Sequence, residues 1–136
     1  MKKYLLILLL ALTACSQSGY DRERATELCN IASERELSPE ETAEMIEQDR
    51  ILLQEQQDRL NSLLDENDSQ DFDDAFLEAM ADTAFVARVE MGERMWRILV
   101  RNRPNLTESN LPLYNQLYEL RLIVDLLNDD LNQRLD

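Results

Sequence analysis

Residues 112–135 read PLYNQLYELRLIVDLLNDDLNQRL, and the leucines and the valine of this stretch recur at the spacing of a helix. The apolar positions follow one another after four, three, four, three and four residues: Leu113, Leu117, Leu120, Val124, Leu127 and Leu131. Side chains at such intervals form one apolar row along a helix face, which packs against other helices. The stretch therefore predicts a long helix, opened by Pro112, in an all-α protein.

A second stretch, 39–65, has a well-marked helix start. Ser38 can act as the N-cap, Pro39 suits the first helical position, and Glu41 completes a capping box with Ser38. Apolar residues recur every seven positions after this start, so the stretch predicts a second long helix. A shorter helical pattern over 20–36 precedes it.

The stretch 72–102 is apolar on two adjacent faces. A helix that is apolar over so wide an arc usually lies at the centre of its domain, so we expect one long central helix here, ended by Pro104. Gly92 inside it predicts a close helix crossing or a kink. The sequence thus predicts a small all-α bundle of four helices, the first one short, with short loops that favour antiparallel neighbours.

The composition excludes several classes of function. The 136 residues include 28 acidic and 14 basic side chains, two glycines and no histidine. Without histidine, Ser-His-Asp and Cys-His catalysis and the helical metal motifs are excluded, and two glycines exclude glycine-rich phosphate loops. A net charge of −14 argues against nucleic-acid binding, which depends on cations that contact phosphate. We therefore expect no enzyme, no catalytic residue, no cofactor and no metal site.

The N-terminal segment has the layout of an export signal. Lys2 and Lys3 precede an uncharged apolar run over residues 4–12, which is too short to span a bilayer. The run ends at Leu12-Thr13-Ala14-Cys15, which resembles the lipobox of bacterial lipoproteins. The resemblance covers residues 1–15 only and implies nothing about the fold that follows.

The resemblance implies cleavage between Ala14 and Cys15, a diacylglyceryl group on the Cys15 thiol, and usually a further acyl chain such as palmitate on the new amino group. Residues 1–14 are then a signal peptide, 15–19 a lipidated cysteine with a short tether, and 20–136 one acidic helical domain. The four residues of the tether span at most ~14 Å, so the domain would lie close to the lipid.

The residue after the lipidated cysteine bears on the location of the protein. Ser16 resembles the pattern of Gram-negative lipoproteins that are sent to the outer membrane. A Gram-positive host, with the domain outside its single membrane, stays open, as does the choice between a periplasmic and a surface position. Cys29 has no intramolecular partner once Cys15 carries lipid, so we expect it either buried in the core or in an intermolecular disulfide.

The charges are distributed unevenly along the chain. Residues 38–82 carry 15 acidic residues and two arginines, whereas residues 83–103 carry five arginines and two glutamates. Two sets of candidate partner-binding residues follow: Arg94, Arg97 and Arg101 on one side of their helix, and Glu40, Glu41, Glu44 and Glu47 on the helix before it. Either the two sets match each other inside the domain, or each forms a surface. An arginine surface would suit lipid phosphate or an anionic partner, and an acidic surface a cationic protein.

These features predict a membrane-anchored lipoprotein of the bacterial cell envelope, with the outer membrane as its expected location. We expect it to act as a non-catalytic protein-binding or structural accessory module. The alternative is an inhibitor or immunity-type lipoprotein that neutralises a basic envelope-acting enzyme through its acidic helix. In both cases the partners are the bilayer, through acylated Cys15, and an envelope protein, and the oligomeric state is not predicted.

Overall fold

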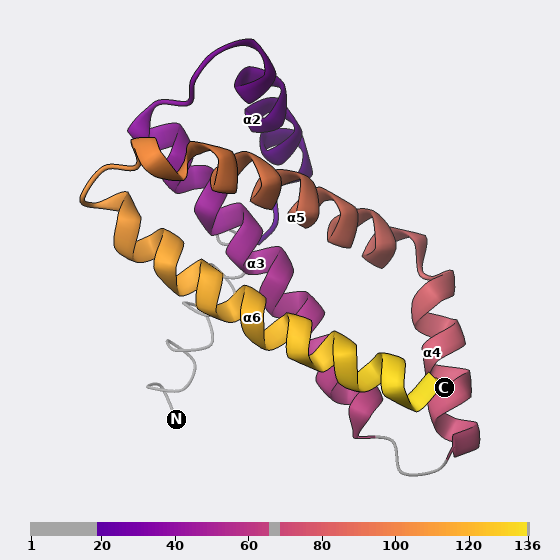
Figure 1. Ribbon diagram of the computed structural model, residues 1–136. Helices are drawn as coiled ribbons and strands as arrows, with labels where there is room; N and C mark the ends of the chain where they lie inside the picture. Colours follow the sequence, from indigo (N-terminus) through magenta and orange to yellow (C-terminus); the bar gives the residue numbers. More distant parts are fainter. Residues whose placement is uncertain (1–18, 66–68, 136) are drawn as a thin grey trace, which may run out of the picture.

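The computed structural model describes residues 19–65 and 69–135, and these residues fold into α-helices with no strand among them (Figure 1). The elements in chain order are α2 (Arg22–Glu34), α3 (Pro39–Leu64), α4 (Ser69–Ala81), α5 (Thr83–Asn102), the short 3-10 helix η1 (Arg103–Asn105) and α6 (Asn110–Leu135). The predicted all-α class is confirmed. None of the helices in the described ranges is both long enough and apolar enough to cross a membrane.

The central helix of the bundle is α3. Both α5 and α6 pack along it, and α2 and α4 contact both α3 and α5 (Figure 1). The prediction that residues 72–102 form the central helix is therefore wrong. The reason is that α3 buries side chains on two of its sides, one against α5 and one against α6. It does so although its sequence is more polar than that of residues 72–102.

The predicted helix 72–102 is divided in two, so the described part of the chain has five α-helices instead of four. The break lies at Asp82, whose backbone is extended and whose side chain accepts a hydrogen bond of 3.1 Å from the backbone N–H of Phe85. Aspartate favours such an N-cap over a helix interior, because its side chain bonds the free N–H groups of the first turn. The break leaves Leu77 and Met80 on the surface of α4.

The predicted start of α3 is confirmed in detail. The Ser38 hydroxyl accepts a hydrogen bond of 3.1 Å from the Glu41 N–H, and the Glu41 carboxylate accepts one of 2.8 Å from the Ser38 N–H. Cys29 is buried, with its sulfur 3.9 Å from the sulfur of Met91, which confirms the core alternative for this thiol.

The buried face of α6 follows most of the predicted row and departs from it at Leu113. Leu117, Val124 and Leu131 are buried as expected, but Leu113 is 42% exposed. Their neighbours on the buried face are instead Asn110, Tyr114 and the largely buried Arg121. Asn110 and Arg121 can be buried because each finds a partner on α3, the Pro39 carbonyl and the Asp49 carboxylate respectively. Leu120 and Leu127 of the predicted row are half-buried against the core, and only Leu113 lies toward solvent.

Gly92 lies at a close crossing of α5 over α3, one of the two alternatives predicted for it. A Cβ added there would lie 3.4 Å from Asp49 Oδ1 and 3.7 Å from Leu52 Cβ, which is ordinary contact. Its backbone has no positive φ, so no left-handed conformation demands glycine. The crossing is therefore tight but has room for a methyl group.

Replacing Gly92 with alanine should raise the free energy of unfolding by up to about 1 kcal/mol, because alanine favours the helix over glycine. Gly92→Leu should lower it, since a branched side chain would overlap α3. Urea unfolding followed by the fluorescence of Trp96, the single tryptophan, measures both. A loss of stability on Gly92→Ala would contradict the spacing described here.

Candidate functional site

Three of the four acidic residues singled out on α3 form ion pairs, and their arginines are not those of α5. Hydrogen bonds from Arg35 and from the Ser38 N–H lower the pKa of Glu41 to about 2. A hydrogen bond from Arg24 also lowers the pKa of Glu44. The ion pairs are Glu41–Arg35 at 2.8 Å, Glu44–Arg24 at 2.7 Å and Glu47–Arg50 at 2.5 Å. Glu40 is exposed at the start of the helix. Glu41, Glu44 and Glu47 are therefore neutralised inside the domain, but by arginines of α2, the α2–α3 loop and α3 and not by those of α5.

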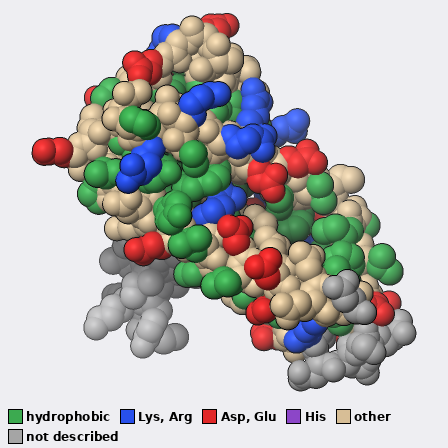
Figure 2. Space-filling view, viewed as in Figure 1, with side chains coloured by type: hydrophobic (Ala, Val, Ile, Leu, Met, Phe, Trp, Pro, Cys, Tyr) green, Lys and Arg blue, Asp and Glu red, His purple; other side chains and the backbone are tan. Residues whose placement is uncertain are grey.

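Arg94, Arg97 and Arg101 are all exposed on α5. Within residues 19–65 and 69–135, no carboxylate lies within salt-bridge distance of any of the three. Figure 2 shows blue side chains gathered over this part of the molecule. Of the two alternatives, the pairing of these arginines with the α3 glutamates is not found in the described ranges, because the three side chains are exposed on α5 and three of those glutamates pair with other arginines.

A second exposed set, an apolar row, lies on α6. Tyr118, Leu122 and Leu126 stand at successive turns of the helix and are 47%, 47% and 66% exposed. Trp96 of α5 joins the two helices, with its ring 6.1 Å from that of Tyr118. Green side chains accompany the blue ones on the face drawn in Figure 2. We call this combined surface the α5–α6 face: Arg94, Arg97, Val100, Arg101, Tyr118, Leu122 and Leu126.

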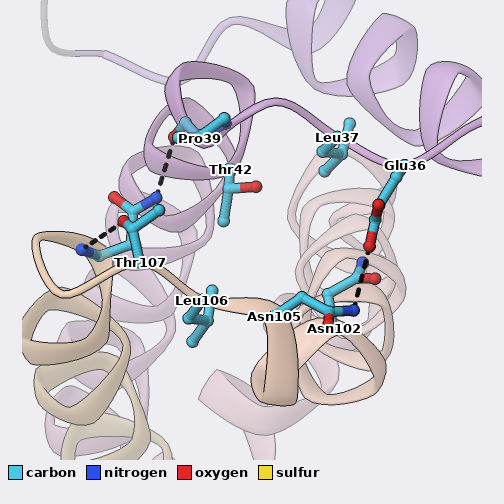
Figure 3. Close-up of a pocket in the computed structure, with 9 residues that line it drawn as sticks. Glu36, Leu37, Pro39, Thr42, Asn102, Asn105, Leu106 and Thr107 are labelled. Carbon is cyan, nitrogen blue, oxygen red and sulfur yellow. Dashed lines mark hydrogen bonds between the residues drawn. The ribbon is translucent and has the colours of Figure 1, made fainter.

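A polar pocket lies at one end of the bundle, where the α2–α3 loop, η1 and the start of α6 meet (Figure 3). Its volume is about 290 Å³. The lining residues come from these segments and the adjoining turns of α3 and α5, and are Glu36, Leu37, Pro39, Thr42, Asn102, Asn105, Leu106, Thr107 and Asn110. The mixture of amides, hydroxyls and one carboxylate gives this pocket the chemistry of a site for a small polar group.

Three asparagine amides hold the wall of the pocket together, each as a donor. Asn110 Nδ2 donates to the Pro39 carbonyl at 2.9 Å, Asn105 Nδ2 to Glu36 Oε1 at 3.0 Å, and Asn102 Nδ2 to the Ile98 carbonyl at 3.0 Å. The first two of these bonds tie segments that are about 70 positions apart in the sequence. The pocket is therefore built by the fold and is not a gap between loops.

A buried ion pair at the centre of the bundle escaped the sequence analysis. Asp49 of α3 is fully buried, and Arg121 of α6 donates to both of its carboxylate oxygens, at 2.9 and 3.2 Å. Burial raises the pKa of Asp49 to about 7, and the Arg121 guanidinium opposes this rise. The guanidinium also lies 5.3 Å from the centre of the Trp96 ring. The pair ties α6 to α3 next to the Gly92 crossing.

The sequence did contain a signal for this pair. Asp49 occupies a core position of α3, one turn after Met45 and one turn before Leu52. Arg121 stands likewise between Leu117 and Val124 on the buried face of α6. A charged residue at a core position on each of two helices that pack together indicates a buried pair.

The remaining predicted site residues lie outside the described part of the chain. They are Ala14 and Cys15, the predicted cleavage and lipidation positions. Within the described ranges, no group of three or more metal-binding side chains comes together. In comparisons with known proteins, no family model, no curated protein and no solved structure matches this chain.

Proposed function

We propose that this chain is a lipid-anchored lipoprotein of the bacterial envelope that acts as a non-catalytic protein-binding module. The observation that carries the proposal is the α5–α6 face, which combines three exposed arginines of α5, without an ion-pair partner among the described residues, with an exposed apolar row of α6. Tyrosine, tryptophan and arginine are the residues that dominate the energy of protein interfaces. Exposed apolar residues that follow one another along a helix, unlike single scattered ones, also favour an interaction site.

The position of the first described residues supports a short connection to the membrane. The backbone N–H of Asp21 donates to Gln48 Oε1 of α3 at 2.8 Å, and the Asp21 side chain caps α2. The chain is therefore fixed to the bundle only six residues after Cys15. An acyl group on that cysteine would hold the bundle within about 20 Å of the lipid, given ~3.5 Å per residue.

The anchor is tested by Cys15→Ala. The wild-type chain should fractionate with membranes and carry two or three acyl chains on its N-terminal cysteine, as measured by mass spectrometry. Cys15→Ala should abolish both properties, because alanine has no thiol to receive the diacylglyceryl group. Effectively stable anchoring needs more than one acyl chain. An unmodified N-terminus on a chain found free in the periplasmic or culture fluid would overturn the anchoring part of the proposal.

The binding part is tested by affinity capture from detergent-solubilised envelopes with charge-matched double variants. Arg97→Gln/Arg101→Gln should reduce recovery of the partner at least about tenfold, since arginine truncation in an interface typically costs more than 1 kcal/mol. Arg22→Gln/Arg50→Gln, which removes the same charge from α2 and α3, should leave recovery unchanged. Equal recovery with both pairs would overturn the α5–α6 face, and loss with Glu40→Gln/Glu44→Gln alone would favour the inhibitor alternative.

A further inference from the structure

The polar pocket contains a hydroxyl that is open to the pocket and is not used by any described residue. Thr42 is only 7% exposed, and its side chain points into the pocket in Figure 3. No described residue forms a hydrogen bond with its Oγ1. A hydroxyl that faces a pocket and is not used in its wall can donate or accept a hydrogen bond with a group bound there.

The other polar groups of the pocket present an excess of acceptors. The amide nitrogens of Asn102 and Asn105 are used in the wall, and within the described residues no donor reaches their Oδ1 atoms. Glu36 is exposed at the rim and uses only Oε1 in its bond to Asn105. A ligand that donates several hydrogen bonds therefore fits this pocket better than an anion or a carbonyl compound.

Size and charge narrow the class of ligand. The volume of about 290 Å³ lies at the lower end of small-molecule sites, so the pocket suits a single side chain. Leu37 and Leu106 provide apolar walls that can contact a methylene stem. The chain has a net charge of −14, and its field attracts cations. A planar guanidinium offers five donors to acceptors in different directions, which an ammonium group does not.

We propose that this pocket receives an arginine side chain of the partner protein. The guanidinium donates to Thr42 Oγ1, to the amide oxygens of Asn102 and Asn105, and to the carboxylate of Glu36, while the stem lies between the two leucines. The proposal assumes a partner protein, so it rests on the proposed binding function. It places a second contact point at the end of the bundle, with charge opposite to that of the α5–α6 face.

The experiment uses N-acetylarginine amide as the probe and N-acetylcitrulline amide, its uncharged isostere, as the control. In ¹H–¹⁵N spectra of the purified chain as the cell produces it, the arginine probe should cause saturable shifts at the amides of Thr42, Asn105 and Leu106. The citrulline probe should bind at least about tenfold more weakly, because hydrogen bonds to a charged group are the stronger ones. Equal binding of the two probes, or equal binding of N-acetyllysine amide, would overturn the assignment.

Two variants test the named acceptors. Thr42→Val preserves the shape of the side chain and removes only the hydroxyl, and Glu36→Gln removes only the charge at an exposed position. Each should weaken binding of the arginine probe about tenfold or more. Since Thr42 Oγ1 has no partner, Thr42→Val should leave the unfolding midpoint unchanged or raise it, which separates lost binding from lost folding. Unchanged affinity in both variants would overturn the proposal.

The probe needs no partner protein, so the two proposals can fail separately. Probe binding without an effect of the arginine variants on capture would retain the pocket and reject the α5–α6 face. The opposite result would retain the binding function and reject an arginine in this pocket.

Discussion

Arg121→Met is expected to lower the free energy of unfolding by about 3–5 kcal/mol at pH 8, the usual cost of removing one partner of a buried ion pair. Asp49 is fully buried, and its ion pair with Arg121 joins α3 to α6. Methionine retains the stem that packs near Trp96 but leaves the carboxylate without its counter-charge. Urea unfolding followed by Trp96 fluorescence provides the measurement.

Two further variants separate the charge from the packing. The double variant Asp49→Leu/Arg121→Met should recover most or all of the lost stability, because buried pairs are often replaced by apolar residues without cost. Arg97→Met, a change of the same type on the surface of α5, should alter stability by less than about 0.5 kcal/mol. A loss below 1 kcal/mol for Arg121→Met would contradict a closed, water-free pair.

The features of the fold that could be predicted are those encoded within one or two turns of chain. The capping box of Ser38 and Glu41, the burial of Cys29 and the tight crossing at Gly92 all follow from local patterns and are found in the structure. The break at Asp82 was missed because the apolar pattern continues across it. The capping preference of a single aspartate there overrides the periodicity of its neighbours.

The candidate site could be predicted less well from the sequence, because its contacts depend on which helices pack together. The predicted arginines and glutamates are real surface charges, but their partners could not be assigned before α3 was known to be the centre. The polar pocket joins segments around Glu36, Thr42 and Asn105, and no local pattern links them. Asp49 and Arg121 look like interruptions of two apolar rows until those rows are placed face to face.

The stability of this protein should fall as pH rises from about 4 to 7 because of the buried carboxyl of Asp49. Burial raises the pKa of Asp49 from 3.8 to about 7, so between these values the folded state retains a proton that the unfolded state has lost. Each pH unit in this window should cost up to about 1.4 kcal/mol, with no further effect of this group above pH 7. Urea unfolding at half-unit intervals measures the slope.

Asp49→Asn isolates this contribution because asparagine resembles the protonated carboxyl and does not titrate. Relative to wild type, the variant should gain stability as pH rises from 4 to 7, and the difference should be constant above pH 7. The paired carboxyl of Glu41 acts with the opposite sign and in another window, since its pKa is lowered to about 2 and its stabilisation is lost only below about pH 4.5. Parallel stability curves for wild type and Asp49→Asn between pH 5 and 7 would show that Arg121 keeps Asp49 ionised throughout, and that the ion pair compensates its own burial.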